Sequence, residues 1–260
     1  MQIYIPTFGR SDRQITYLGL PPALQRRTKL VVQRSEAKLY ADFPHVVLPP
    51  SITTVAPTRQ WIVTKGHEAY GGGDPFLVML DDDLRWAERR TDDPGKFIAS
   101  DVKSVTRLFA EIERQLKSHA HVGVSARESA HTNAEPVRHT TRMTRVLAYD
   151  YRVLQRLRVR FDRLPVQEDF DVTLQLLRLG YANAVINGWV HNQDGSNARG
   201  GCSHFRTPEM QAETSQKLAD LHAPFVKVVT KTPLKAWGGG PRTDVVVAWK
   251  QAYKSSKVAV

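Results

Sequence analysis

The distribution of apolar and polar positions predicts strands and helices that alternate along the chain. Short apolar runs between turn-forming residues predict strands at 2–6, 29–32, 45–48, 76–80, 121–125, 145–149 and 184–191. Apolar residues at helical spacing predict helices at 35–42, 56–70, 100–116 and 169–179. Strands separated by helices form a largely parallel sheet with helices on both faces, so the pattern predicts the α/β class.

The strand expected at 76–80 runs directly into Asp81, Asp82 and Asp83. Adjacent carboxylates repel one another, so this arrangement is stable when a cation or several donors lie among them. Oxygen ligands of this kind suit magnesium or manganese, which usually also hold a substrate phosphate. Taken alone, the triplet is better explained as a solvated acidic turn. Its place at the carboxyl end of a strand, where α/β proteins bind ligands, favours a binding site.

Composition predicts the class of protein and its compartment. The chain has 260 residues, 41% of them hydrophobic, which is enough to bury a substantial core. Cys202 is the single cysteine, so no internal disulfide can form. There is no signal-like N-terminal segment, and no apolar run approaches the roughly 18 residues that span a membrane. We therefore expect a soluble cytoplasmic protein with no membrane partner.

The net charge of +11 predicts a polyanionic partner. Arginines are concentrated between positions 138 and 163, where they number eight against two acids, Asp150 and Asp162. They are Arg138, Arg142, Arg145, Arg152, Arg156, Arg158, Arg160 and Arg163. Arginine makes bidentate contacts with phosphate, so the run is a candidate DNA-binding surface. A solvated helix face explains the run alone equally well.

A second acidic motif begins with Glu168 and Asp169, at the start of the helix expected at 169–179. Helix capping is sufficient to explain two acids at this place. The residues that follow are an aromatic residue, an aspartate and an amphipathic helix that closes on Gly180-Tyr181. In this order they resemble the Glu-Asp motif of GT-A glycosyltransferases of family 2.

Other segments resemble the same family in the same order. Residues 5–10 resemble its first strand and nucleotide-binding loop, and residues 57–60 resemble its Ala-Arg-Asn step, with Gln60 in place of the usual asparagine. Residues 80–83 correspond to its DxD motif, and His191 to the histidine that ends a later strand. The resemblance implies a GT-A (Rossmann-like) catalytic core at 1–192 and a C-terminal extension at 193–260 that contributes to the acceptor site.

The resemblance also implies roles for single residues and identifies a nucleotide diphosphate-sugar, preferably a UDP-sugar, as donor. Asp169, with Glu168 beside it, would be the general base of an inverting transfer. Mn²⁺ or Mg²⁺ would be bound by Asp83, Asp81 and His191, with His204 as the alternative histidine. The donor would be bound by Pro6, Thr7, Arg10, Arg59, Asp81 and Asp82, and Arg59 would offset charge on the leaving diphosphate.

DNA is the acceptor that the sequence favours, because the arginine run lies just before Asp169. The turn-rich stretch at 192–206 resembles phage enzymes that glycosylate 5-hydroxymethylpyrimidines in DNA. Such an enzyme flips its target base into the pocket, where Trp189, Phe205 or Trp237 would stack on the base unless they are ordinary core residues. The expected acceptor contacts are Arg138, Arg142, Arg145, Arg152, His204 and Arg206.

Two other functions remain open from the sequence. A soluble glycosyltransferase acting on a saccharide or a protein would keep the same donor site but would not respond to DNA. A non-catalytic DNA-binding protein would use the basic residues only, and would not need Asp81, Asp83, Asp169 and His191 together.

Overall fold

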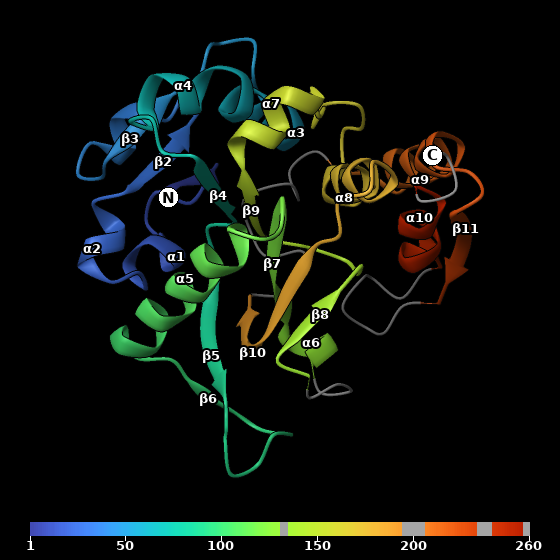
Figure 1. Cartoon of the computed structure of the whole chain (residues 1–260). Coiled ribbons are helices and arrows are strands. Elements are labelled where there is room, and N and C mark those ends of the chain that lie inside the picture. The colour runs from blue at the N-terminus through green and yellow to red at the C-terminus, as the bar shows by residue number, and fades with distance from the viewer. Residues whose placement is uncertain (131–134, 194–205, 233–240, 257–260) are drawn as a thin grey trace.

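The computed structural model describes residues 1–130, 135–193, 206–232 and 241–256. A ten-stranded sheet forms its centre (Figure 1), in the order β3 (His45–Val47), β2 (Thr28–Val32), β1 (Gln2–Thr7), β4 (Phe76–Leu80), β9 (Val146–Asp150), β7 (His121–Ala126), β10 (Ala184–Asn192), β5 (Arg85–Arg89) and β6 (Phe97–Ala99). The tenth strand, β8 (Val137–His139), lies outside this order and pairs with β10. Strands β1 to β4 are parallel to one another, as are β7 and β10, whereas β9 and β5 are antiparallel to their neighbours.

Helices cover both faces of this sheet. One face packs against α1 (Ile15–Leu18), α2 (Pro22–Gln25), the short helix η1 (Ala37–Tyr40) and α5 (Val102–Leu116). The other packs against α3 (Val55–Trp61), the π-helical turn η2 (Ile62–Gly66), α7 (Tyr151–Leu157) and α8 (Glu168–Arg178). Alternate strand residues supply the two cores: Ile3 and Ile5 face the first layer and Tyr4 faces the second. The predicted α/β class is confirmed.

Most expected elements occur within a few residues of their predicted bounds. The helix expected at 56–70 is continuous from α3 through η2 into α4 (His67–Tyr70). The helix expected from 100 begins at Val102, because the Asp101 carboxylate caps it by accepting from the Ser104 amide at 2.7 Å. The helix expected at 35–42 is reduced to the short 3-10 helix η1, and the Glu36 carboxylate just before it accepts from the amide of Gly9.

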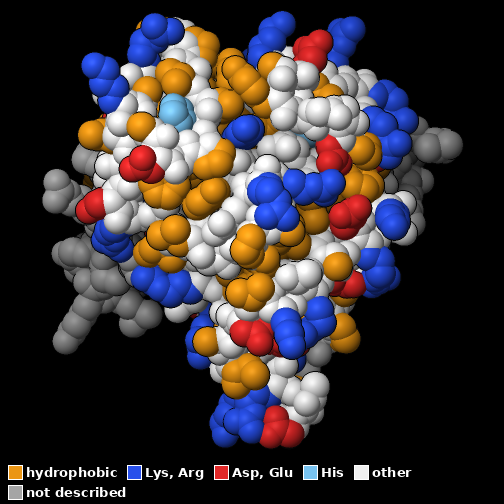
Figure 2. Space-filling view, turned by 90° about the vertical axis from the view of Figure 1, so that its left-hand side faces the viewer, with side chains coloured by type: hydrophobic (Ala, Val, Ile, Leu, Met, Phe, Trp, Pro, Cys, Tyr) orange, Lys and Arg blue, Asp and Glu red, His pale blue; other side chains and the backbone are white. Residues whose placement is uncertain are grey.

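The carboxyl ends of β1, β2, β3 and β4 meet at one edge of the sheet, because these strands are parallel. Strand β9 runs the opposite way, with Val146 opposite Leu80, so the loop that precedes it reaches the same edge. Beyond it, the β5–β6 hairpin projects from the body of the molecule (Figures 1 and 2). The edge at the end of β4 therefore collects loops from both halves of the sheet.

The described part of the C-terminal extension packs against α8. It contains α9 (Pro208–Leu221), the hairpin of β11 (Val226–Lys231) and β12 (Arg242–Val247), and α10 (Trp249–Ser255). Phe170 and Leu174 of α8 join a core with Leu218, while Val172 and Leu176 face the main sheet. Helix α8 therefore lies between two apolar cores. None of the described helices is long and apolar enough to cross a membrane.

Candidate active site

The three aspartates that follow β4 differ in their contacts. Asp82 is buried, and both of its oxygens are engaged: Oδ2 accepts from Thr7 Oγ1 at 2.7 Å and Oδ1 from Arg10. Asp83 Oδ2 accepts from the same Arg10 at 3.1 Å. Donor binding by Asp82 stays a prediction. Its contacts hold Arg10 and the end of β1 beside the acidic triplet.

Arg59 joins the two acidic motifs. It lies in α3 and is buried, with Nη2 donating to Asp81 Oδ1 at 2.8 Å and Nη1 donating to Glu168 Oε1 at 2.5 Å. Its predicted role in offsetting charge on a leaving diphosphate stays a prediction. In the structure the guanidinium binds two protein carboxylates, one at the end of β4 and one at the start of α8.

Protein atoms surround the acidic cluster closely enough to disfavour its charged forms. Loss of water around the carboxylate raises the pKa of Asp81, although 34% of its side chain is exposed. The positive charge of Arg59 acts in the opposite direction and lowers this pKa. Burial likewise raises the pKa of Glu168, again opposed by Arg59. The charge of Asp169 raises both of these pKa values further, which places this carboxylate in the same cluster. The arginines therefore favour the ionised forms of these carboxyls, against the effect of burial.

Asp169 is the more accessible acid of the Glu-Asp motif. Its side chain is 15% exposed, whereas that of Glu168 is 8% exposed and is bound by Arg59. Asp169 Oδ1 accepts from the Phe170 amide at 3.0 Å, and Oδ2 lies 4.0 Å from Arg142 Nη2. Of the two predicted catalytic residues, Asp169 is thus the less buried, while Glu168 is bound to Arg59.

The predicted metal ligands can be tested by their donor atoms. Asp81 Oδ1 and Asp83 Oδ2 are bound by arginines, and the second oxygen of each accepts from no described donor. His191 on β10 is fully buried, and burial, followed by Arg145, lowers its pKa to about 3, so its imidazole is neutral. Neither ring nitrogen has a hydrogen-bond partner among the described residues.

Two free carboxylate oxygens suit Mg²⁺ or Mn²⁺, which take their remaining ligands from diphosphate and water. Within the described ranges, no three histidine, cysteine or acidic side chains form a ready-made metal site. Participation of His191 therefore stays a prediction. The alternative, His204, lies outside the described residues, as do Phe205 and Trp237.

The expectation that the arginine run forms one patch is wrong. Arg152 is paired with Asp150 at 2.7 Å. Asp150 lies opposite Phe76, at the start of β4, whereas Asp81 follows the end of β4, so this ion pair lies at the opposite edge of the sheet from Asp81. Further along, Arg163 binds the buried Asp171. The run spans β8, β9 and α7, so its members point to different parts of the surface. Cationic side chains are likewise dispersed among acidic and apolar ones on the face shown in Figure 2.

Two members of the run, Arg142 and Arg145, lie in the loop before β9 and reach the acidic cluster. Arg142 is 52% exposed, and its guanidinium carbon lies 4.3 Å from the centre of the Phe170 ring. Arg145 has a φ of 62° and opposes the rise in the pKa of Asp81 and Asp83. Arg138, on β8, donates to Ser125 Oγ at 3.3 Å. Arg206 lies just before α9.

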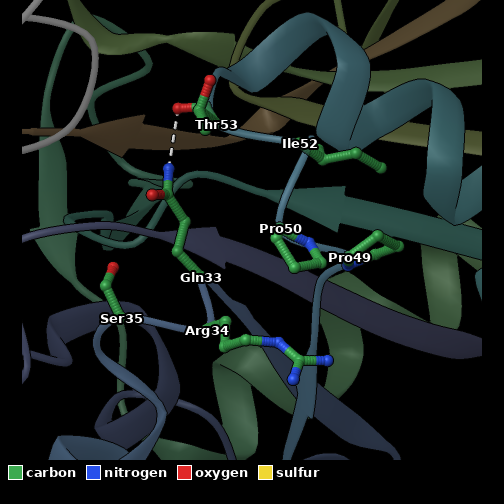
Figure 3. Close-up of a pocket in the computed structure, with 7 residues that line it drawn as sticks. All are labelled: Gln33, Arg34, Ser35, Pro49, Pro50, Ile52 and Thr53. Atoms are coloured by element: carbon green, nitrogen blue, oxygen red, sulfur yellow. Dashed lines mark hydrogen bonds between the residues drawn. The ribbon is translucent and has the colours of Figure 1, made fainter.

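A pocket of about 280 Å³ lies beyond the ends of β2 and β3 (Figure 3). It is lined by Gln33, Arg34, Ser35, Pro49, Pro50, Ile52 and Thr53. Figure 3 shows Gln33 reaching to Thr53, whose carbonyl oxygen accepts from Gln33 Nε2 at 2.7 Å. Strand β1 lies between β2 and β4, so the pocket is about 10 Å, or two strand spacings, from the triplet. None of these lining residues was predicted from the sequence to bind the donor, although the ends of strands beside the triplet are places where a ligand is expected.

Comparison with known proteins identifies a family. The sequence model of the family described as TET-Associated Glycosyltransferase matches residues 1–201. No curated protein matches the sequence.

Solved structures give more distant similarities. The mannosyltransferase PcManGT from Pyrobaculum calidifontis, solved with GDP-Man and Mn²⁺, has a TM-score of 0.46 and 12% identity over 72% of this chain and 56% of its own. The present chain thus spans about half the length of that enzyme. Glucosyl-3-phosphoglycerate synthase from Mycobacterium tuberculosis, solved with Mn²⁺, UDP and phosphoglyceric acid, has a TM-score of 0.47 and 11% identity over 95% of this chain and 86% of its own.

We predict that replacing Arg59 with methionine lowers the free energy of unfolding at pH 8 by about 3 kcal/mol, because the buried Glu168 loses its partner. The loss should shrink by pH 5. An unpaired buried carboxyl has a pKa above its unfolded value, so its penalty disappears as the pH falls through that pKa. Urea denaturation at both pH values measures the effect.

The matched control is Arg152→Met, which removes a largely exposed arginine from its pair with Asp150. This variant should lose no more than about 1 kcal/mol. If Arg59→Met lowers the free energy of unfolding no more than the control does, or by the same amount at both pH values, the contacts of Arg59 with Asp81 and Glu168 are unimportant for stability.

Proposed function

The chain belongs to the TET-associated glycosyltransferase family, and we propose that it transfers a sugar from a nucleotide diphosphate-sugar to the hydroxyl of a 5-hydroxymethylpyrimidine in DNA, with inversion at the anomeric carbon. Membership of a glycosyltransferase family removes the possibility of a non-catalytic DNA-binding protein. The observation that carries the proposal is the position of Asp169. It is a partly exposed carboxylate beside the Asp81–Arg59–Glu168 bridge, with the cationic Arg142 at 4.0 Å.

The donor would lie along the edge formed by β2, β1 and β4. The pocket beyond β2 and β3 accommodates the base, and we retain uridine diphosphate as the preferred nucleotide. Gln33 uses its Nε2 on the Thr53 carbonyl, which leaves its own carbonyl oxygen to accept from the N3–H of a uracil. The diphosphate would then reach Asp81 and Asp83, where their free oxygens hold Mn²⁺ or Mg²⁺. When bound there, the ion supplies positive charge that stabilises the departing diphosphate.

Asp169 supports a single-displacement mechanism. Its carboxylate accepts the proton of the acceptor hydroxyl while that oxygen forms a bond to the anomeric carbon. The bond from this carbon to the diphosphate oxygen breaks, and the diphosphate leaves with the electron pair. Attack opposite to the leaving group inverts the anomeric configuration. Glu168 does not compete as base, because Arg59 holds it at 2.5 Å.

Arg142 and Arg145 support a phosphate-bearing acceptor. Both come from the loop before β9. Arg142 is exposed beside Asp169, and Arg145 is paired at 3.2 Å with the exposed Glu128, which a phosphate would have to displace. A nucleic acid whose phosphates bind there would bring a hydroxymethyl group toward the base. The remaining arginines of the run are dispersed, which keeps a saccharide or protein acceptor as the second candidate. Such an acceptor would bind with little dependence on salt.

The function is tested by incubating the enzyme with UDP-glucose, Mn²⁺ and duplexes that contain cytosine, 5-hydroxymethylcytosine or 5-hydroxymethyluracil, followed by mass spectrometry of the nucleosides. We expect a hexosyl adduct only on a hydroxymethylated base.

Asp169→Asn should reduce the rate roughly a hundredfold to ten-thousandfold, because no side chain then accepts the proton. Asp162→Asn, an exposed aspartate paired with Arg160, is the control. Near-native transfer by Asp169→Asn, or retained configuration, contradicts the mechanism.

Nucleotide binding should depend on a divalent ion. We expect UDP to bind at least tenfold more tightly with Mn²⁺ than with a chelator, and Asp83→Asn to remove most of this difference, because one carboxylate ligand is lost. Isothermal titration calorimetry measures both. Asp220→Asn changes an exposed acid of α9 and should leave binding unchanged. Equal affinities in Mn²⁺ and chelator would reject the metal site.

Salt dependence separates DNA from an uncharged acceptor. If Arg142 and Arg145 bind phosphates, replacing both with alanine should reduce the slope of log affinity against log salt by about 1.8 units, or 0.9 for each contact. Fluorescence anisotropy with a labelled duplex measures this slope. The control is the double replacement of Arg152 and Arg160, which pair with neighbouring acids elsewhere on the surface. If only the control flattens the slope, the DNA surface lies at another place.

A further inference from the structure

A buried ionic group lies two residues beyond Asp169. Asp171 is fully buried in α8, and its carboxylate accepts from Arg163 Nε at 2.9 Å, Gln175 Nε2 at 3.0 Å and His222 Nε2 at 2.7 Å. Arg163 Nη2 donates to it as well. A buried carboxylate must be surrounded by donors in this way to remain charged. Three of these donors come from α8 and the segment before it, whereas His222 follows α9.

His222 is fixed from two sides by α8. Arg178 Nη1 lies 3.3 Å from His222 Nδ1 and also donates to the Leu221 carbonyl at 2.9 Å. His222 Nε2 lies 2.7 Å from Asp171 Oδ1 and 3.1 Å from Arg163 Nη2. Because a carboxylate only accepts, the shorter contact requires that Nε2 carries the hydrogen donated to Asp171. The imidazole is 2% exposed. The end of α9 is thereby attached to two points about two helical turns apart on α8.

A second link joins α9 to the residue before the Glu-Asp motif. Gln167 has a left-handed backbone, with a φ of 62°, and its Nε2 donates to Ser215 Oγ at 3.2 Å. A non-glycine residue keeps this conformation only where its surroundings hold it. On the same side, Phe170 packs against Trp249 with ring centres 5.5 Å apart. The first turn of α8 is therefore held by α9 and α10 as well as by the sheet.

We propose that His222 is a positioning residue for the transfer step: by binding Asp171 it fixes the first turn of α8 and so the direction of the Asp169 carboxylate. The inference rests on the proposed function, in which Asp169 is the base. A base misplaced by about 1 Å can lose roughly a hundredfold in rate, so a contact that makes no bond to substrate is still measurable. His222 lies beyond residues 1–201, which the family matches.

The central test compares His222→Ala with His222→Gln in transfer from UDP-glucose to the hydroxymethylated duplex. His222→Ala should lower kcat about tenfold or more and leave UDP affinity unchanged, because the pocket and the aspartates after β4 are untouched. Glutamine places an amide where Nε2 was and should restore most of the rate. Unchanged kcat in His222→Ala, or no rescue by glutamine, would overturn the proposal.

A control separates positioning from a general loss of stability. His121 is as buried as His222 and binds the Tyr181 carbonyl at 2.9 Å, but it lies at the start of β7, away from the site. His121→Ala should keep native kcat at temperatures where it remains folded. A loss in kcat equal to that of His222→Ala would make the effect one of stability and would overturn the proposal.

A double-mutant cycle distinguishes failure of this inference from failure of the proposed function. If His222 acts through Asp169, His222→Ala should change the residual rate of Asp169→Asn by less than about twofold. A full tenfold loss in both backgrounds overturns the role of His222 and leaves Asp169 as the base. A native rate in Asp169→Asn alone overturns the proposed function.

A measurement without substrate keeps the proposal testable even if transfer is not detected. Amide hydrogen exchange at 167–172 should be faster in His222→Ala and return toward the native rate in His222→Gln, with β1 and β4 unchanged. Unchanged exchange would overturn the proposal. If His222→Ala does not fold, Arg178→Ala removes the other contact of the imidazole from an exposed position. Faster exchange over the same residues supports the proposal, and native exchange overturns it.

Discussion

The site depends on the burial of one guanidinium, that of Arg59, between Asp81 and Glu168. Carboxylates at the end of β4 and at the start of α8 repel one another and are removed from water, so each needs a cation at hydrogen-bonding distance. Arg59 supplies it to both motifs, at 2.8 Å and 2.5 Å. Any shift of α3, β4 or α8 relative to the others would leave a buried charge unpaired. The end of β4, where we propose that the donor binds, and the start of α8, where we propose the base, are therefore held in a fixed relative position.

This constraint divides the acids of the site into two kinds. Asp82, Glu168 and Asp171 are buried and bound by arginine, threonine or histidine donors, so they hold the structure. Asp81 and Asp83 each keep an oxygen that accepts from no described donor, and Asp169 is partly exposed. In the sequence, each of the two acidic motifs contains acids of both kinds. Only the contacts in the structure separate the acids with an unbound or exposed oxygen from the acids that are bound by neighbouring side chains.

The strands and helices were predictable wherever the signal was local. Runs such as 76–80 are buried on both faces and read as strands whatever surrounds them. Strand β5 was missed because Arg85, Glu88 and Arg89 interrupt its apolar pattern, and its pairing partner is a hundred residues away in β10. The arginine run failed for a related reason: a charge count cannot show that Arg152 and Arg163 are each paired with an aspartate. His222 carries no motif at all, since its partner is set by the tertiary fold.

Helix α8 shows how one segment serves both the core and the site. Its Val172 and Leu176 pack on the main sheet, while Phe170 and Leu174 pack on the C-terminal extension, so it cannot slide without disturbing two cores. A helix buried on one side only could rotate about its axis at smaller cost, and its first residues would fray. Contacts from Arg59 on one side and His222 on the other fix that first turn. The proposed base thus lies in a helix turn that is held from both sides. A proton acceptor that must meet a hydroxyl within hydrogen-bonding reach needs such a fixed position.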